Sequence, residues 1–168
     1  MKQNYLELIS LNFKEHAEVL NSSQALQKNL DKTSSIISSS LKKGKKIIWC
    51  GNGGSAYTAS HFITDWNKMV NIATGNKFHG ISLCDNIGLV TAFGNDLSYD
   101  EIFSGQLKSI MEPEDLLIAV SGSGNSPNVI SAIKYANSIG AETLAIVGYD
   151  GGKAKQVAKN SVWVPSYD

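Results

Sequence analysis

Two short segments rich in Gly and Ser carry residue types suited to binding an anion. Residues 51–55 read Gly-Asn-Gly-Gly-Ser, and residues 121–126 read Ser-Gly-Ser-Gly-Asn-Ser. Each segment follows a short apolar run and leads into a stretch of helical length. A Gly-rich turn before a helix lets the backbone approach a ligand and points free amides and the positive end of the helix dipole at it. Turn formers alone would explain either segment, but the two together favour a phosphate site.

Uncharged donors must hold such a phosphate. Ser55, Ser121, Ser123 and Ser126 offer hydroxyl groups, and Asn52 and Gly53 lie in the first segment. All fifteen basic residues are Lys, so the bidentate guanidinium fork of Arg is absent from the chain. Neither segment has the spacing of a phosphate-binding loop ending in Lys-Ser or Lys-Thr, nor that of the dinucleotide fingerprint. We therefore expect no nucleotide cofactor.

Three further residues could do chemistry. His61 and Asp65 are four residues apart on a predicted helix, so they project from one face. Such a pair supplies two metal ligands, or an imidazole beside a carboxylate for proton transfer. An ordinary hydrogen-bonded helical pair is the simpler alternative. Asp96, in Gly94-Asn95-Asp96, is a candidate ligand contact or else a capping or turn residue.

The elements that position these residues alternate along the chain. Short apolar runs predict strands at residues 47–50, 80–84, 116–120, 143–147 and 162–164. Segments of helical length lie at residues 55–70, 100–111, 127–139 and 153–159. This alternation predicts an α/β fold with a parallel sheet, right-handed crossovers and helices on both faces. A ligand would then bind beyond the carboxyl ends of the strands, near a switch in strand order.

The first 43 residues have a different pattern. Apolar residues at helical spacing over residues 4–43 predict two amphipathic helices with a break near Asn21 to Ser23. Their apolar faces serve packing within the chain or contact between subunits. We predict a single domain over residues 1–168, with N-terminal helices at 1–43 and an α/β core at 44–168.

Composition excludes several classes of protein. The 168 residues carry 15 basic and 15 acidic side chains and 42% apolar residues, which predicts one globular domain without a nucleic-acid surface. Cys50 and Cys84 each close an apolar run, as buried reduced thiols do, so we expect no disulfide. The first twenty residues lack the pattern of a secretory signal, and no apolar run approaches the roughly 20 residues that span a bilayer. These features predict a soluble cytoplasmic protein without a membrane partner.

Several short motifs, in order, carry a family resemblance. They are Cys50 to Ser55, His61-Phe62, Gly94-Asn95-Asp96, Ile102-Phe103-Ser104, Ser121 to Val129, Gly148 to Lys153 and Val164-Pro165. With these motifs the chain resembles the SIS (sugar isomerase) domain family, and within it the branch of phosphoheptose isomerases. The resemblance implies a three-layer α/β/α sandwich with a five-stranded parallel sheet. It also implies a homotetramer with N-terminal helices at its centre and active sites between subunits.

The resemblance implies roles for the candidate residues. Ser55, Ser121, Ser123 and Ser126 would hold a sugar phosphate, with Asn52 and Gly53 near the substrate and Asp96 on its hydroxyl groups. Asp65, with His61, would act in a proton transfer between C1 and C2 through an enediol. The expected reaction converts D-sedoheptulose 7-phosphate to D-glycero-D-manno-heptose 7-phosphate, for lipopolysaccharide or capsule heptose. His61 and Asp65 would also be ligands of the zinc found in some members.

The chain departs from the family pattern in three places. Asp65 stands where the family usually has Glu, and the region Lys68 to Val70 replaces a usual Arg. The family's C-terminal helix, which carries a Gln and a His, is absent from this chain. The change at Asp65 and the missing C-terminal helix favour a second hypothesis, a non-catalytic SIS module that senses a phosphosugar or contacts a partner protein. A third hypothesis is an isomerase for a different phosphosugar.

Overall fold

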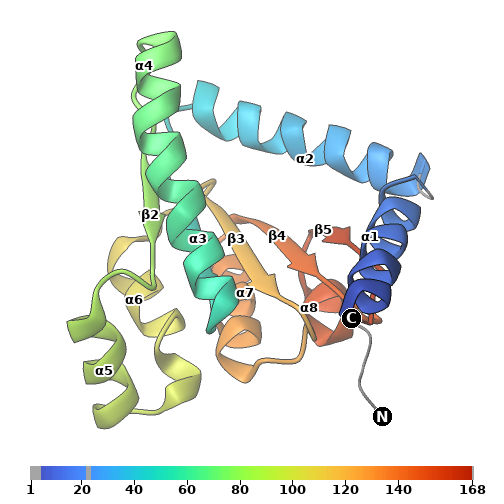
Figure 1. Ribbon diagram of the computed structural model, residues 1–168. Coiled ribbons are helices and arrows are strands. Elements are labelled where there is room, and N and C mark those ends of the chain that lie inside the picture. The colour runs from blue at the N-terminus through green and yellow to red at the C-terminus, as the bar shows by residue number, and fades with distance from the viewer. Residues whose placement is uncertain (1–4, 22–23, 168) are drawn as a thin grey trace.

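The fold is a parallel five-stranded sheet with helices on both faces, as predicted from the sequence (Figure 1). The structure, a computed structural model, describes residues 5–21 and 24–167. The strands are β1 (Ile47–Gly51), β2 (Gly80–Ser82), β3 (Leu116–Ser121), β4 (Glu142–Val147) and β5 (Asn160–Trp163). Their order in the sheet is β2-β1-β3-β4-β5, so the chain changes direction across the sheet between β1 and β3. Such a switch point is where open α/β sheets bind ligands.

Helices cover both faces of the sheet. Their bounds are α1 (Tyr5–Asn21), α2 (Gln24–Lys42), α3 (Gly54–Asp65), α4 (Asn71–Thr74), α5 (Ile87–Asp96), α6 (Ser104–Ile110), α7 (Pro127–Ser138) and α8 (Gly152–Val157). Helices α2 and α3 lie on one face, and α6, α7 and α8 lie on the other (Figure 1). Residues 22 and 23, where the break between the first two helices was predicted, lie outside the described residues.

Alternate strand residues pack on opposite faces of the sheet. Ile48 and Cys50 belong to the hydrophobic cluster shared with α6 and α7, whereas Ile47 and Trp49 belong to the one shared with α3. The period of two along each strand produces this division. All five residues of β1 are buried, as expected for a central strand covered on both faces. The loops that follow the central strands therefore start from a sheet that is packed on both faces.

The structure corrects two parts of the helix prediction. The helix predicted over residues 55–70 is regular only to Asp65, where a π-helical turn (Trp66–Val70) begins and leads into α4. Helix α5 was not predicted, because its sequence is apolar on nearly every side and gives no clear helical period. Its one local signal is Asn86, whose side chain caps the helix by accepting from the Leu89 amide at 3.1 Å.

Both cysteines of the chain are free, as predicted. Burial raises the pKa of the Cys50 thiol, and burial likewise raises the pKa of Cys84. Both therefore stay protonated at neutral pH and behave as small apolar groups. Within residues 5–21 and 24–167, no helix has the length and apolar character needed to cross a membrane.

Candidate functional site

The two Gly-rich loops begin side by side at one edge of the sheet. Gly51 at the end of β1 pairs with Val120 near the end of β3 in parallel register. Asn52 and Ser121, the next residues, therefore leave neighbouring strands at the same level. These strands flank the switch point in strand order, so the structure brings together the loops that the sequence placed far apart.

A reciprocal pair of amides joins the two loops. Asn52 Nδ2 donates to Asn128 Oδ1 at 2.9 Å, and Asn128 Nδ2 donates back to Asn52 Oδ1 at the same distance. Asn128 is buried in the first turn of α7, and its Oδ1 also accepts from the Val129 amide. The hydroxyl of Tyr99 donates to Asn52 Oδ1 at 3.1 Å. The Asn52 side chain therefore fixes the spacing of the loops.

We expect replacement of Asn128 by Leu to weaken this coupling and to destabilise the protein by about 1–3 kcal/mol, because Asn52 and the Val129 amide lose a partner. Sugar phosphate affinity should fall as well. Urea denaturation of Asn128→Leu, Asn52→Leu and the double variant gives the measurement. If the double variant loses as much as the sum of the single variants, the two amides do not act as a pair.

The serine loop, residues 121–126, is ordered by its own hydroxyl groups. The Gly124 amide donates to Ser121 Oγ at 3.2 Å, and the Asn125 amide donates to Ser123 Oγ at 3.2 Å. Ser121 Oγ and Ser126 Oγ lie 3.4 Å apart. Ser121 is buried and Ser123 is exposed. Because Ser121 Oγ and Ser123 Oγ accept these bonds from the backbone, the bonds do not use their hydroxyl protons, which can donate to an anion at the N-terminus of α7.

Two backbone hydrogen bonds connect the serine loop to the turn after β4 and to α8. The Gly148 amide donates to the Gly122 carbonyl at 2.8 Å, and the Ala154 amide donates to the Gly124 carbonyl at 2.8 Å. Gly124 has φ of 63°, and a Cβ on it would collide with the Gly151 carbonyl oxygen. Glycine is thus required at 124 for both conformation and space.

Replacing Gly124 by Ala should therefore displace the serine loop and destabilise the protein by about 1–3 kcal/mol, with a loss of sugar phosphate affinity. Gly44→Ala is the matched control, because Gly44 has φ of 66° but nothing within 4 Å of an added Cβ. Thermal denaturation and calorimetric titration measure the two effects. Equal losses in both variants would mean that backbone strain alone, and not the collision, limits position 124.

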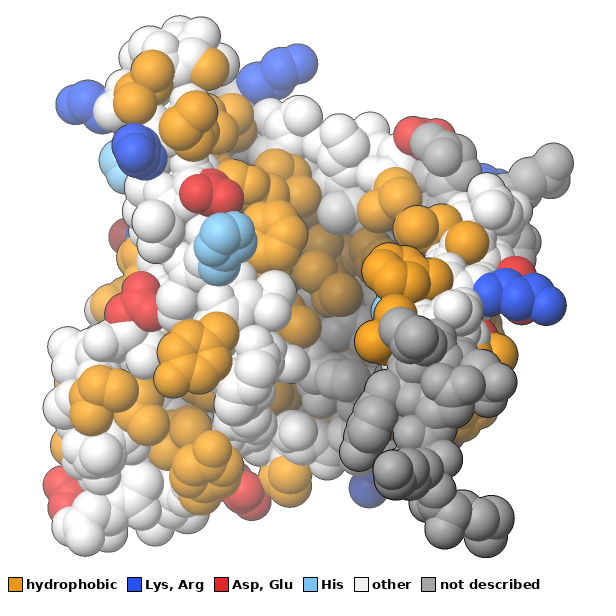
Figure 2. Space-filling view, in the orientation of Figure 1, with side chains coloured by type: hydrophobic (Ala, Val, Ile, Leu, Met, Phe, Trp, Pro, Cys, Tyr) orange, Lys and Arg blue, Asp and Glu red, His pale blue; other side chains and the backbone are white. Residues whose placement is uncertain are grey.

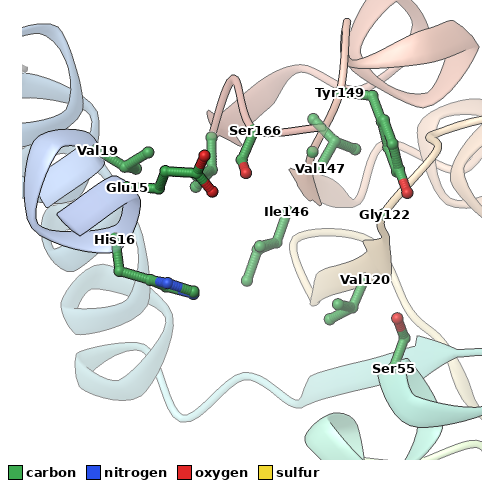
Figure 3. A pocket seen from close by; sticks show the side chains of 12 residues that line it. Glu15, His16, Val19, Ser55, Val120, Gly122, Ile146, Val147, Tyr149 and Ser166 are labelled. Atoms are coloured by element: carbon green, nitrogen blue, oxygen red, sulfur yellow. The ribbon is translucent and has the colours of Figure 1, made fainter. Parts of the chain in front are cut away.

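One cavity of about 380 Å³ opens beside the loops. Ser55 from the first loop and Gly122 from the second both line it, together with Tyr149 after β4 (Figure 3). Glu15 and His16 of α1 line its other side. The same face of the molecule is hollowed between α1 and α3, with hydrophobic side chains on the floor of the hollow (Figure 2). One residue of each loop, Ser55 and Gly122, thus borders the same solvent-accessible space, whereas Ser121, Ser123 and Ser126 do not line it.

His61 and Asp65 are exposed neighbours on α3 whose side chains contact each other. His61 Nε2 lies 3.2 Å from Asp65 Oδ2, and the two side chains are 74% and 56% exposed. Neither residue lines the cavity that Ser55 lines. The helical rise places Asp65 about 15 Å beyond Ser55 along the axis of α3. Within one chain, the candidate base and the phosphate loops therefore stand apart.

A zinc ion does not fit the donors of the described residues. Among residues 5–21 and 24–167, no group of three or more His, Cys, Asp or Glu side chains could hold a metal ion. His61 and Asp65 supply two donors, whereas zinc in proteins takes at least three protein ligands. No step of the chemistry is therefore assigned to a metal, and the zinc site stays a prediction.

The remaining site prediction concerns Asp96. It ends α5, is exposed, and accepts a hydrogen bond from Asn95 Nδ2 at 2.9 Å. Tyr99, three residues later, is the residue of this segment that reaches the first loop. Sequence reasoning did not single out Tyr99, Asn128 or Tyr149. For Asn128 and Tyr149 the available signal was their place within the two motifs 121–129 and 148–153.

Together, these observations define an α/β domain with two Gly-rich loops and a cavity at the carboxyl ends of its strands, where its strand order switches. The family model for the SIS domain matches residues 13–148. The chain belongs to the SIS domain family, and the predicted resemblance is confirmed.

Similar proteins cover most of the chain. It is 40% identical over 145 residues to the phosphoheptose isomerase of Aliarcobacter butzleri, covering 86% of this chain and 76% of the relative. It is 37% identical to the phosphoheptose isomerase of Helicobacter pylori strain P12, covering 96% and 84%. The solved phosphoheptose isomerase of Neisseria gonorrhoeae superposes with a TM-score of 0.90 at 30% identity, covering 98% and 88%. The likeness thus extends through the fold and both loops.

Proposed function

We propose that this protein is a phosphoheptose isomerase, an aldose-ketose isomerase that converts D-sedoheptulose 7-phosphate to D-glycero-D-manno-heptose 7-phosphate. The observation that carries the proposal is that Ser55 and Gly122, one from each Gly-rich loop, line a single cavity. The relatives named phosphoheptose isomerase support the choice of reaction. We place the reaction in the cytoplasm, where it supplies heptose for lipopolysaccharide or capsule.

The serine loop binds the phosphoryl group in this proposal. Backbone amides, the hydroxyls of Ser121, Ser123 and Ser126 and the N-terminus of α7 replace the charge that Arg would supply. Ser55 completes the grip from the first loop, and Asp96 contacts sugar hydroxyls. The phosphate thereby anchors the substrate and holds the opened sugar in one orientation, which lowers the entropic cost of reaction.

Asp65 is the proposed base. It removes the proton from C1 of the ketose while O2 takes up a proton from water, which gives the enediol. It then returns the proton to C2 while O1 releases its proton to water, and His61 holds the carboxylate by its 3.2 Å contact. Because Asp65 stands about 15 Å along the helix from Ser55, the reacting carbons meet Asp65 at a boundary between subunits. We expect a homotetramer, and exposed apolar side chains of α1 support contact between subunits, since Phe13 and Leu20 are 74% and 75% exposed.

Incubation of the purified protein with D-sedoheptulose 7-phosphate tests the proposal. We expect formation of the aldose phosphate, followed by NMR, and a tetramer in light scattering. A panel of pentulose and hexulose phosphates controls for substrate choice. Binding of the ketose without turnover by a folded oligomer would sink the isomerase proposal and support the non-catalytic sensing hypothesis.

A further inference from the structure

Tyr149 has an unusual backbone conformation at the edge of the cavity. Its φ is 45°, in the left-handed region that a bulky residue rarely adopts. Among the described residues only Glu114 is another non-glycine with positive φ, and it lies in an exposed turn before β3. Tyr149 instead lines the cavity that Ser55 and Gly122 share. Strain of this kind persists only where the surroundings enforce it.

Three contacts enforce the conformation of Tyr149. Its amide donates to the Ser166 carbonyl at 3.0 Å, and its carbonyl accepts from Trp163 Nε1 at 2.9 Å. The Trp163 indole is itself held by Lys155, whose Nζ lies 3.3 Å from the ring centroid. The Tyr149 ring meets Tyr167 edge to face, with centroids 5.7 Å apart. The C-terminal segment thus fixes the direction of the Tyr149 side chain.

That direction carries the ring over the serine loop. A Cβ placed on Gly122 would lie 3.7 Å from Tyr149 Cε2, so the ring stands against the loop. In Figure 3 the phenolic oxygen points toward Gly122, on the side of the cavity where Ser55 lies. Tyr149 as a residue is 40% exposed. The Tyr149 ring thus forms part of the cavity wall, and its hydroxyl is the polar group at the end of that ring.

We infer that Tyr149 is a substrate-contacting residue that closes the phosphate end of the cavity and donates its phenolic hydrogen to the bound sugar phosphate. This inference rests on the proposed function. The Tyr149 ring limits which ketose phosphates fit in the cavity. The Tyr149 hydroxyl donates one hydrogen bond to the bound sugar phosphate. The left-handed backbone conformation of Tyr149 directs its side chain toward the serine loop.

Two variants separate contact with the ligand from packing. Tyr149→Phe keeps the ring and removes the hydroxyl, so we expect KM for sedoheptulose 7-phosphate to rise roughly 2–12-fold, the loss of one hydrogen bond. Tyr149→Asn removes the ring but tolerates the left-handed backbone, so KM should rise further while the melting temperature stays within about 2 °C. In both variants kcat should change less than KM. Tyr167→Phe, a neighbouring ring that does not line the cavity, should match the wild type.

Calorimetric titration with sedoheptulose 7-phosphate and with inorganic phosphate keeps the test independent of turnover. If the wild type binds the ketose but does not isomerise it, the proposed function fails while the Tyr149 affinities still decide this inference. Unchanged affinity in Tyr149→Phe and Tyr149→Asn would overturn it. A lower melting temperature of Tyr149→Asn with wild-type affinity in Tyr149→Phe would overturn it too, because Tyr149 would then serve only the fold.

Discussion

Replacing Asp65 with Asn should lower kcat for sedoheptulose 7-phosphate by about 10²–10⁴-fold, the range for removal of a positioned general base. The Asn amide has nearly the same shape as the carboxylate and can still accept a hydrogen bond from His61, so the contact between positions 61 and 65 survives. The amide is not basic enough to remove the proton from C1. KM should change much less, since the phosphate loops are untouched. Steady-state kinetics of the aldose phosphate product measure both constants.

Two companion variants sharpen the result. Asp65→Glu lengthens the carboxylate by one methylene group and restores the residue usual in the family, so it should retain or raise kcat. Glu142→Gln is the control, because this acid starts β4 at the opposite edge of the sheet and pairs with Lys159 at 3.3 Å. An Asp65→Asn variant with the activity of the wild type would show that another group removes the proton.

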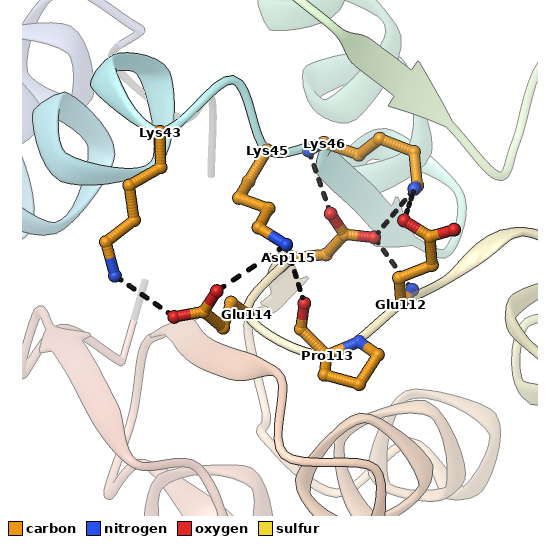
Figure 4. Close-up of polar contacts among 7 residues, drawn as sticks. All are labelled: Lys43, Lys45, Lys46, Glu112, Pro113, Glu114 and Asp115. Carbon is orange, nitrogen blue, oxygen red and sulfur yellow. Dashed lines mark hydrogen bonds and ion pairs between the residues drawn. The ribbon is translucent and has the colours of Figure 1, made fainter.

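Replacing Asp115 with Ala should destabilise the protein by about 3 kcal/mol or more, without a direct effect on the site. Asp115 is fully buried where the chain enters β3, and it accepts from the Lys46 and Glu112 amides at 2.9 and 2.8 Å (Figure 4). Lys46 Nζ lies 3.1 Å from its Oδ2. Burial alone would lower the pKa of Lys46. The hydrogen bonds of Lys46 with Asp115 and Glu112 outweigh burial, so its pKa is raised. Removal of the carboxylate leaves two backbone donors unpaired.

Urea denaturation measures this loss, and Glu114→Gln is its control. Glu114 belongs to the same cluster but is exposed and pairs with Lys43 at 3.3 Å and Lys45 at 3.5 Å (Figure 4). The hydrogen bond from Lys43 lowers the pKa of Glu114, yet water screens an exposed pair, so its denaturation midpoint should barely move. Equal shifts for the two variants would refute the distinction between the buried and the exposed carboxylate.

The fold was predictable because its signals are local. Continuous apolar runs such as Leu116 to Val120 identify strands buried on both faces, and their alternation with helical segments implies a parallel sheet. Helix α5 escaped this reasoning because its apolar side chains show no period, and part of them, such as Ile87, remain exposed at 68%. The π-helical turn after Asp65 likewise has no local sequence signal.

The site was predictable only in part. Gly and Ser at 51–55 and 121–126 marked the anion-binding loops, since only those residue types combine a close backbone with uncharged donors. The spacing of His61 and Asp65 predicted their contact, which the structure confirms at 3.2 Å. Their proposed catalytic roles remain predictions.

The sequence by itself determined the strands, the two loops, the helical pair and the family. Only the tertiary structure decided that Asn52 bonds Asn128 across 76 positions of chain, and that Tyr149 turns its ring onto Gly122. These contacts depend on strand order and register, which place β1 beside β3 and the turn after β4 behind the serine loop. Spacing along a chain fixes neighbours within one helix or strand, whereas neighbours between elements are fixed by packing of the whole core.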